Sequence, residues 1–374
     1  MSPPSRLLNP AERLDWLRLI RSDHVGPVTF FELLQRFGSA AAALEALPDL
    51  ARRGGGRRLP RIFPRADAER ELLALDRFGA RLVAWGEPGY PPALTAIEDA
   101  PPLISIKGDT AQLGRRALAI VGARNASANG RRFARGLAED LGRNDLLIVS
   151  GLARGIDAAA HRGALSSGTL AVVAGGIDVI YPEENRDLHE AIGETGAMIA
   201  ELPIGTEPQA RHFPRRNRLI SGISLGVVVV EAALRSGSLI TTRFALEQGR
   251  EVFAVPGSPL DPRCRGTNDL IRRGATLVEG AYDVLNALEG QLGDTIGKHL
   301  RRISNSTPSH GNESDNEVEK VQLQVLEALG PSPVPVDELV RQCQLSPAII
   351  ATVLLELELA GRLERHPGNH VSLL

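Results

Sequence analysis

Between residues 66 and 288, short apolar runs alternate with helical stretches, and this alternation restricts the fold more than any other feature of the chain. Apolar runs of strand length, many of them β-branched, occur at 81–84, 103–106, 118–121, 146–149, 170–173, 198–200, 227–230 and 252–255. Such strands, joined by crossover helices, are typical of a parallel sheet that helices cover on both faces. We therefore predict an α/β domain with an extended Rossmann-like, mostly parallel sheet, in which the first two strands form the extension.

The two flanks differ from this region. Residues 1–62 place apolar side chains at helical spacing around a Gly26-Pro27 turn, which predicts a small helical domain. The turn is similar to a helix-hairpin-helix, whose amides can contact a DNA phosphate, and a plain helical hairpin explains it equally well. Residues 290–318 lose periodicity and have the composition of a flexible linker.

Helical spacing returns in residues 319–374. Ser346 and Pro347 form the start signal of a helix that ends before Gly361, and a small hairpin is predicted from Leu363 onward. This order of elements is that of a winged-helix domain. We place the sheet domain at 63–289, between the helical domain and the linker.

Composition restricts the kinds of site that the chain can carry. The formal net charge is only −2, so a nucleic-acid site must be a local patch rather than a general basic coat. The only cysteines, Cys264 and Cys343, lie far apart and form neither a disulfide framework nor a metal-ligand cluster. No signal-like or membrane-length apolar stretch is present, and we expect a cytoplasmic protein without a metal or a cofactor.

One patch of that kind lies at residues 211–222. It gathers four arginines, Arg211, Arg215, Arg216 and Arg218, around a single aromatic side chain, Phe213. The planar fork of an arginine binds two phosphate oxygens at once, and a phenylalanine face can stack on a base. Taken alone, a charge run of this length is more often a solvated loop.

The surroundings of this patch favour a binding site. In an open parallel sheet, ligands bind beyond the carboxyl ends of the strands, and glycine turns before helix N-termini are natural phosphate sites. A tight structural turn explains any one of these loops, whereas several at one edge favour an extended anion site. The loops are marked by Gly122, Arg124 and Ser127, by Gly151 and Arg154, by Gly175 and Gly176, and by Ser236, Gly237 and Ser238.

A mononucleotide, a dinucleotide and a polymer strand would each supply the anion. The first parallel strand is not followed by a strict Gly-x-Gly-x-x-Gly, which argues against a dinucleotide, and no Gly-Lys-Ser/Thr indicates a P-loop ATPase. Separate arginines along one edge match the successive phosphates of a polymer, and the lack of a basic recognition helix favours a single strand. Asp157 and His161, four residues apart on one helix, are explained more simply by helix-dipole complementation or a surface pair than by acid–base catalysis.

The predicted recognition helix of the winged-helix domain, residues 346–360, carries Glu356 and Glu358 but neither lysine nor arginine. A helix that reads duplex DNA offers basic or amide groups to the groove. We therefore expect this helix to serve a protein contact or regulation rather than groove reading.

Seven motifs occupy most of residues 117–275. They are VGAR at 121–124, SGLARGID at 150–157, GGIDVIYP at 175–182, FPRRNRLISG at 213–222, SGSLIT at 236–241, GREVFAVPG at 249–257 and GTN at 266–268. Together they resemble the DprA/Smf family, the DNA-processing protein A of natural transformation. The flanks agree with that family in organisation, with a SAM-like helical domain before and a winged-helix domain after.

The resemblance implies a non-catalytic protein that binds single-stranded DNA without sequence preference, protects incoming strands and loads RecA onto them in natural transformation or recombination. It also implies a homodimer formed through the Rossmann-like domain. The residues that we expect to line the DNA groove are Gly122, Arg124, Ser127, Gly151, Arg154, Phe213, Arg215, Arg216, Asn217, Arg218, Ser236, Gly237 and Ser238.

The alternative is a nucleotide-processing hydrolase of the lysine-decarboxylase-like type, which has a related sheet. Such enzymes share a Pro-Gly-Gly-x-Gly-Thr loop that is followed shortly by a glutamate. Here the comparable loop runs from Ser236 to Thr242, and Glu247 comes several residues too late. A purely structural adaptor, the third class, would leave the arginine-rich edge unexplained.

Overall fold

The structure, a computed structural model, describes residues 7–55, 59–288, 315–330, 332–366 and 368–374. They form two compact units. One unit combines residues 8–69 with the described C-terminal residues, and the other contains the described residues from 70 to 288. The predicted helical and winged-helix domains therefore belong to one unit, although they lie at opposite ends of the sequence.

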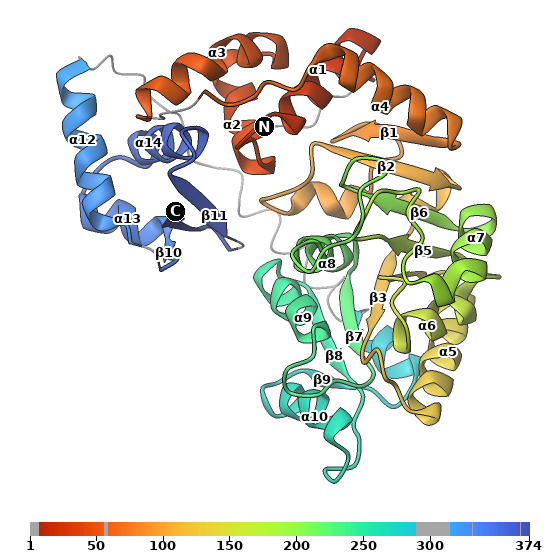
Figure 1. Cartoon of the computed structure of the whole chain (residues 1–374). Coiled ribbons are helices and arrows are strands. Elements are labelled where there is room, and N and C mark those ends of the chain that lie inside the picture. The colour runs from red at the N-terminus through yellow and green to blue at the C-terminus, as the bar shows by residue number, and fades with distance from the viewer. Residues whose placement is uncertain (1–6, 56–58, 289–314, 331, 367) are drawn as a thin grey trace. The chain divides into compact units, whose positions relative to one another are not determined.

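The second unit is built on a nine-stranded sheet of order β1-β2-β6-β5-β4-β3-β7-β8-β9 (Figure 1). Strands β3 to β9 pair in parallel, and β1 and β2 extend the sheet beside β6 by antiparallel pairing. This confirms the predicted fold class. The strands are β1 (Ala80–Ala84), β2 (Leu103–Gly108), β3 (Ala117–Val121), β4 (Leu147–Ser150), β5 (Thr169–Val172), β6 (Ala197–Ala200), β7 (Gly226–Val229), β8 (Glu251–Ala254) and β9 (Thr276–Leu277).

All eight predicted strands are present, and the short edge strand β9 was not predicted. The strand order reverses at β3, which lies between β4 and β7, so the crevice between β3 and β7 is the topological switch point of the sheet. In doubly wound folds, ligands bind at such a point, beyond the carboxyl ends of the strands.

Helices cover both faces of this sheet. Figure 1 shows α5, α6 and α7 on one face and α8 and α9 on the other. Leu137 and Leu141 of α5 are buried against Ile120 of β3 and Ile148 of β4, as their helical spacing predicts. The helices of this region are α4 (Arg65–Arg77), α5 (Ala128–Arg143), α6 (Ile156–Ala164), α7 (Arg186–Thr195), α8 (His212–Ile223), α9 (Ser238–Glu247) and α10 (Arg265–Arg272).

The first unit contains the two small domains. The helical domain has Pro27 at the start of its second helix, after Gly26, as predicted. In the winged-helix domain, the Ser346 side chain caps the last helix by accepting a hydrogen bond from the Ile349 amide. The elements are α1 (Pro10–Arg21), α2 (Pro27–Phe37), α3 (Ala40–Arg53), α12 (Asp315–Ala328), α13 (Val336–Cys343), α14 (Pro347–Leu359), and a sheet of order β10-β12-β11 formed by β10 (Val334–Pro335), β11 (Leu363–His366) and β12 (His370–Leu373).

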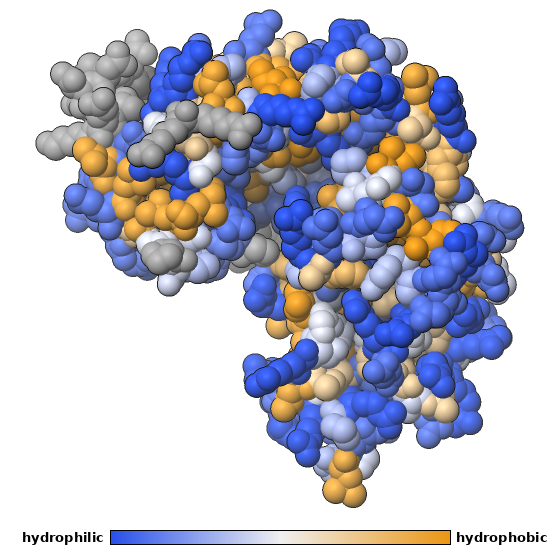
Figure 2. All heavy atoms as spheres, viewed as in Figure 1, coloured by the Kyte–Doolittle hydropathy of each residue, from blue (hydrophilic) through white to orange (hydrophobic). Residues whose placement is uncertain are grey.

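The predicted linker and the polarity of the chain can also be compared with the structure. Most of the predicted linker, residues 290–314, lies outside the described residues, and α12 begins at Asp315, inside the range assigned to the linker. On the face that Figure 2 shows, the sheet domain is mostly hydrophilic, with hydrophobic side chains in small groups. Among the described residues, no helix combines the length and apolar character needed to span a bilayer.

Candidate nucleic-acid interface

A pocket of about 370 Å³ opens at the carboxyl ends of β4 and β5. The loops after β3, β4 and β5 line it together with the first turn of α8. The pocket brings together predicted site residues from three separate motifs: Arg124, Gly151, Arg154, Phe213 and Arg216. The remaining predicted residues do not line it.

The aromatic part of the pocket is a pair of rings with an arginine above one of them. The Arg124 guanidinium lies 5.0 Å from the Phe213 ring centroid, within cation–π distance. The Tyr181 ring lies 5.6 Å from that of Phe213, at an interplanar angle of 55°. Tyr181 is 47% exposed and was not among the predicted site residues, although it is the only aromatic residue of the motif at 175–182.

Some charged side chains at the rim of the pocket form ion pairs, and one arginine does not. Glu183 accepts two hydrogen bonds from Arg186, at 2.7 and 2.9 Å, and these bonds lower the pKa of the Glu183 carboxyl. Arg154 lies 3.5 Å from Glu184. Arg124 forms no ion pair with any described residue and is exposed, so its charge is available to an anionic ligand.

Arg216 forms part of the pocket wall from inside the protein. It is 6% exposed, and its Nη1 donates hydrogen bonds to the carbonyl oxygens of Gly151, at 2.5 Å, and of Val172. Burial lowers the pKa of Arg216 to about 10, and the nearby Asp157 carboxylate opposes that shift. A Cβ atom at Gly151 would lie 2.4 Å from the Arg216 guanidinium, so a side chain at this position would displace Arg216 from its two carbonyl partners.

Arg218 is also buried, at 4% exposure. Its Nε lies 3.1 Å from Asp99, and its Nη2 donates a hydrogen bond of 2.6 Å to Glu201. Arg216 therefore lines the pocket from a buried position and Arg218 does not line it, and contact of either residue with DNA stays a prediction. Of the four arginines at 211–222, only Arg211 and Arg215 lie at the surface. Arg218 follows Arg215 by three residues on the same side of α8, so its burial comes from Asp99 and Glu201, which cover it there, and not from helical periodicity.

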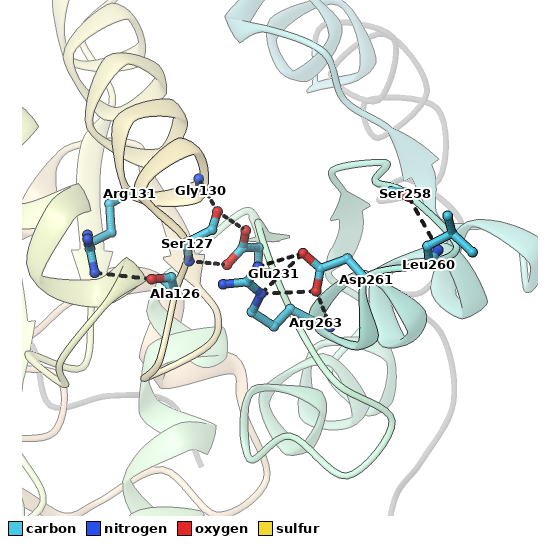
Figure 3. Close-up of polar contacts among 9 residues, drawn as sticks. All are labelled: Ala126, Ser127, Gly130, Arg131, Glu231, Ser258, Leu260, Asp261 and Arg263. Atoms are coloured by element: carbon cyan, nitrogen blue, oxygen red, sulfur yellow. Dashed lines mark hydrogen bonds and ion pairs between the residues drawn. The ribbon is translucent and has the colours of Figure 1, made fainter.

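Ser127 is hydrogen-bonded to a carboxylate of the protein itself (Figure 3). The Glu231 carboxylate, which follows β7, accepts hydrogen bonds from the Ser127 amide at 2.9 Å and from the Ser127 hydroxyl at 2.5 Å. The same hydroxyl accepts a bond from the Gly130 amide, and a Cβ atom at Gly130 would lie 2.5 Å from the carboxyl carbon of Glu231. A side chain of the protein thus occupies the N-terminus of α5, where a Rossmann fold binds a pyrophosphate.

A second group of predicted residues lies beside α8. The Asn217 side-chain amide donates a hydrogen bond of 3.4 Å to the Gly237 carbonyl oxygen, which links α8 to the loop before α9. In that loop, the Ser236 and Ser238 hydroxyls lie 2.8 Å apart, and Gly237 is exposed. Arg235, which precedes this loop, is exposed as well and was not among the predicted residues.

Asp157 and His161 are buried and do not pair with each other. Asp157 accepts a hydrogen bond from the Gly151 amide at 3.1 Å, whereas His161 Nδ1 lies 2.7 Å from Thr169 Oγ1. Since that hydroxyl donates to the Ile148 carbonyl oxygen, His161 Nδ1 carries the proton. Burial and the charge of Arg216 lower the pKa of His161 to about 3. The expected surface pair is therefore wrong, and both side chains have structural partners.

No cluster of three or more histidine, cysteine or acidic side chains with the arrangement of a metal site occurs in the described part of the chain. The site is instead made of arginine, aromatic rings and glycine turns at the carboxyl edge of a doubly wound sheet. These features define a Rossmann-like protein with an open, arginine-bearing edge, accompanied by a helical and a winged-helix domain.

Family comparisons agree with each part of this architecture. Residues 81–289 match the family of the DNA recombination-mediator protein A, residues 10–74 match the DprA-like N-terminal HHH domain, and residues 311–369 match the DprA winged helix domain. The chain belongs to the DNA recombination-mediator protein A family, also called DprA or Smf.

Relatives and solved structures extend the likeness over most of the chain. Protein Smf of Escherichia coli is 39% identical over 314 residues, which cover 83% of this chain and 82% of Smf. The DNA processing protein DprA of Streptococcus pneumoniae is 46% identical over 202 residues, covering 54% of this chain and 71% of that protein. Membership of this family gives the chain a role in DNA processing and recombination.

Two solved structures resemble this one. The X-ray structure of Streptococcus pneumoniae DprA has a TM-score of 0.64 and 34% identity, and the match covers 75% of this chain and 98% of that one. DprA of Helicobacter pylori, whose structure is described for its single-stranded DNA binding mode, has a TM-score of 0.51 and 28% identity, and the match covers 57% of this chain and 96% of that one.

Proposed function

We propose that this chain binds single-stranded DNA without sequence preference and that it does so without catalysis. The observation that carries the proposal is the arrangement of the exposed, unpaired Arg124 over Phe213, with Tyr181 beside it, in one pocket. The rings offer faces to a base, and stacking of this kind stabilises binding by about 1–3 kcal/mol per base. The guanidinium offers its charge to the adjoining phosphate.

A single strand fits this site better than a duplex. The aromatic faces are useful only to an unstacked base, and a pocket of about 370 Å³ is large enough to receive one. Stacking does not discriminate strongly between bases, because every base has a π-face. The site therefore accounts for binding that ignores sequence.

The strand is proposed to continue from the pocket along the exposed side of α8. Arg211 and Arg215 lie there four residues apart, on one face of the helix, and Asn217 connects that helix to the Ser236–Ser238 loop. Arg216 and Arg218 hold the helix in place from below. The predicted groove is thus divided between residues that meet the strand and residues that position them.

For the biological role, we propose that the protein protects incoming single strands and loads RecA onto them in natural transformation or another recombination task, in the cytoplasm. We further propose a homodimer formed through the Rossmann-like domain. Support comes from the family, and from the Helicobacter pylori relative, which is described as binding single-stranded DNA.

The test is a fluorescence anisotropy titration with a single-stranded oligonucleotide and its duplex at two salt concentrations. We expect tighter binding of the single strand, and a log–log salt slope that falls by about 0.7 for each phosphate contact removed. Arg124→Ala should reduce both affinity and slope. Arg143→Ala removes the same charge at the C-terminal end of α5, far along the helix from the loop that holds Arg124, and is the matched control. Equal affinity for both DNA forms, or no difference between the two variants, would contradict the proposal.

The hydrolase alternative has less support. Glu247, the glutamate nearest to the Ser236–Ser238 loop in sequence on its C-terminal side, ends α9, and Glu231 is held by Ser127. A direct assay decides between the two functions. Incubation with nucleoside monophosphates should release no base, and release that depends on Ser236 would instead establish the enzyme.

A further inference from the structure

Helix α14, the recognition helix of the winged-helix domain, is apolar on all sides. Its sequence, PAIIATVLLELEL, contains no basic residue and only two acidic ones. A helix that meets water on one face has a polar stripe, and one that is apolar all round is buried on both sides. The composition therefore predicts a second packing partner besides the core of the winged helix.

The burial of individual residues agrees with this prediction. Ile350, Leu354 and Leu357 pack in the core of the winged-helix domain. Leu355 and Leu359 are only 3% and 0% exposed but lie outside that core cluster. Because α14 contacts α3 of the helical domain, this second apolar face is covered by the N-terminal part of the same chain.

The approach of the two domains is close at the end of α3. A Cβ atom at Gly54 would lie 2.1 Å from the Glu356 carbonyl oxygen, so only glycine fits there. Arg362, just after α14, donates a hydrogen bond of 3.3 Å to the Gly54 carbonyl oxygen. Glu356 itself is 3% exposed, and burial raises the pKa of its carboxyl.

A polar cluster completes the contact. Arg365 of β11 donates to both carboxylate oxygens of Glu32 in α2, at 3.0 and 3.1 Å, and to Glu358 of α14 at 2.9 Å. Glu358 also accepts a hydrogen bond from the buried Thr29 hydroxyl of α2. The side chains of Arg365 and Glu358 are only 15% and 12% exposed, so their charges are satisfied by one another rather than by water.

We propose that the outer face of α14 is a docking surface for the chain's own helical domain, so that the two domains at opposite ends of the sequence act as one module. A groove-reading helix must be free to enter the major groove, and α14 is covered on that side. The helix therefore contributes to DNA handling through domain architecture and not through contact with duplex DNA.

Charge complementarity argues for this partner. One cation, Arg365, lies between an acid of each domain, and the glycine at position 54 leaves space for the backbone of α14 alone. The competing occupant is the helical domain of a second copy, exchanged between two chains. The two arrangements make the same contacts and are separated by experiment.

Amide hydrogen exchange of the full chain provides the test. Arg365→Glu and Glu32→Arg should each accelerate exchange in α3 and in α14, by about tenfold or more, since each places like charges together at a largely buried ion pair. The double variant restores opposite charges and should recover protection. Arg341→Glu reverses an exposed charge in the same domain and should change neither helix.

A mixture of the two single variants distinguishes the occupants. The chain with Arg365→Glu has acids at both position 32 and position 365, and the chain with Glu32→Arg has arginines at both. In the mixture, an acid can therefore meet an arginine only if the two chains exchange domains. Recovery of protection in that mixture would overturn docking within one chain. Unchanged exchange in both single variants, or a double variant as unprotected as the singles, would overturn the docking surface itself.

Discussion

Two neighbouring arginines of α8 allow contact with DNA to be tested separately from support of the fold. Arg215 and Arg216 have the same chemistry and adjacent positions, yet Arg215 is exposed and Arg216 is only 6% exposed. We predict that Arg215→Ala weakens single-strand binding and leaves stability unchanged. We predict that Arg216→Ala destabilises the sheet domain and weakens binding only as a consequence.

The magnitude follows from the partners of Arg216. Removing Arg216 leaves two buried carbonyl oxygens without their hydrogen-bond donor. It also leaves the buried Asp157 carboxylate without a nearby positive charge. A buried acceptor left without its donor costs about 1–3 kcal/mol. Burial raises the pKa of Asp157, and loss of the nearby Arg216 charge, which lowers that pKa, adds to the cost of keeping Asp157 ionised. In a domain of this size, a loss of about 3 kcal/mol lowers the melting temperature by about 6–12 °C. An exposed substitution such as Arg215→Ala should stay within about 0.5 kcal/mol.

Thermal unfolding by circular dichroism measures the first effect, and anisotropy with a single-stranded oligonucleotide measures the second. Adding Asp157→Asn to Arg216→Ala removes the buried negative charge and should recover about 1–3 kcal/mol of the loss. The reasoning is refuted if Arg216→Ala melts like the wild type while its DNA affinity falls, because that result would make Arg216 a direct contact.

Three other predictions concern His161, Ser127 and the winged-helix domain. Stability should fall as the pH drops from about 6.5 toward 3, by up to about 1.4 kcal/mol per pH unit, because unfolding frees the buried neutral His161 to bind a proton; His161→Asn should flatten that dependence in chemical denaturation. Ser127→Ala should cost about 1 kcal/mol as a lost N-cap without reducing DNA affinity; an affinity loss at full stability would return Ser127 to the groove. Removing residues 319–374 should leave most single-strand affinity, measured by mobility shift, and near-total loss would contradict the assignment of the site to the sheet domain.

The sheet and its carboxyl edge could be predicted from the sequence because both depend on local patterns. Apolar runs located the strands, and glycine turns located the loops that meet at the pocket. The edge strand β9 was missed because two residues, Thr276 and Leu277, are too few to form a pattern.

The role of each arginine could not be predicted in the same way. Arg215 and Arg216 differ only in the direction that the helix gives them, and the acids that meet Arg218 come from distant parts of the chain, at Asp99 and Glu201. Ion pairing between residues far apart in sequence leaves no local signal. Tyr181 was missed for a different reason, because one aromatic in a loop is recognisable as a stacking surface only when Phe213 lies beside it.

The position of Glu231 explains why an open Rossmann-like edge would serve a polymer here. At the switch point between β3 and β7, its carboxylate accepts hydrogen bonds from the Ser127 amide and hydroxyl. In a Rossmann fold, donors at this position bind a pyrophosphate. A phosphate placed there would meet a negative charge, so a dinucleotide loses its main anchor. The free Arg124 comes from the loop after β3, but it lines the pocket at the carboxyl ends of β4 and β5 together with the aromatic rings. We therefore propose that anion binding takes place at this open pocket and not at the enclosed N-terminus of α5, so that a strand of any length can continue along the surface.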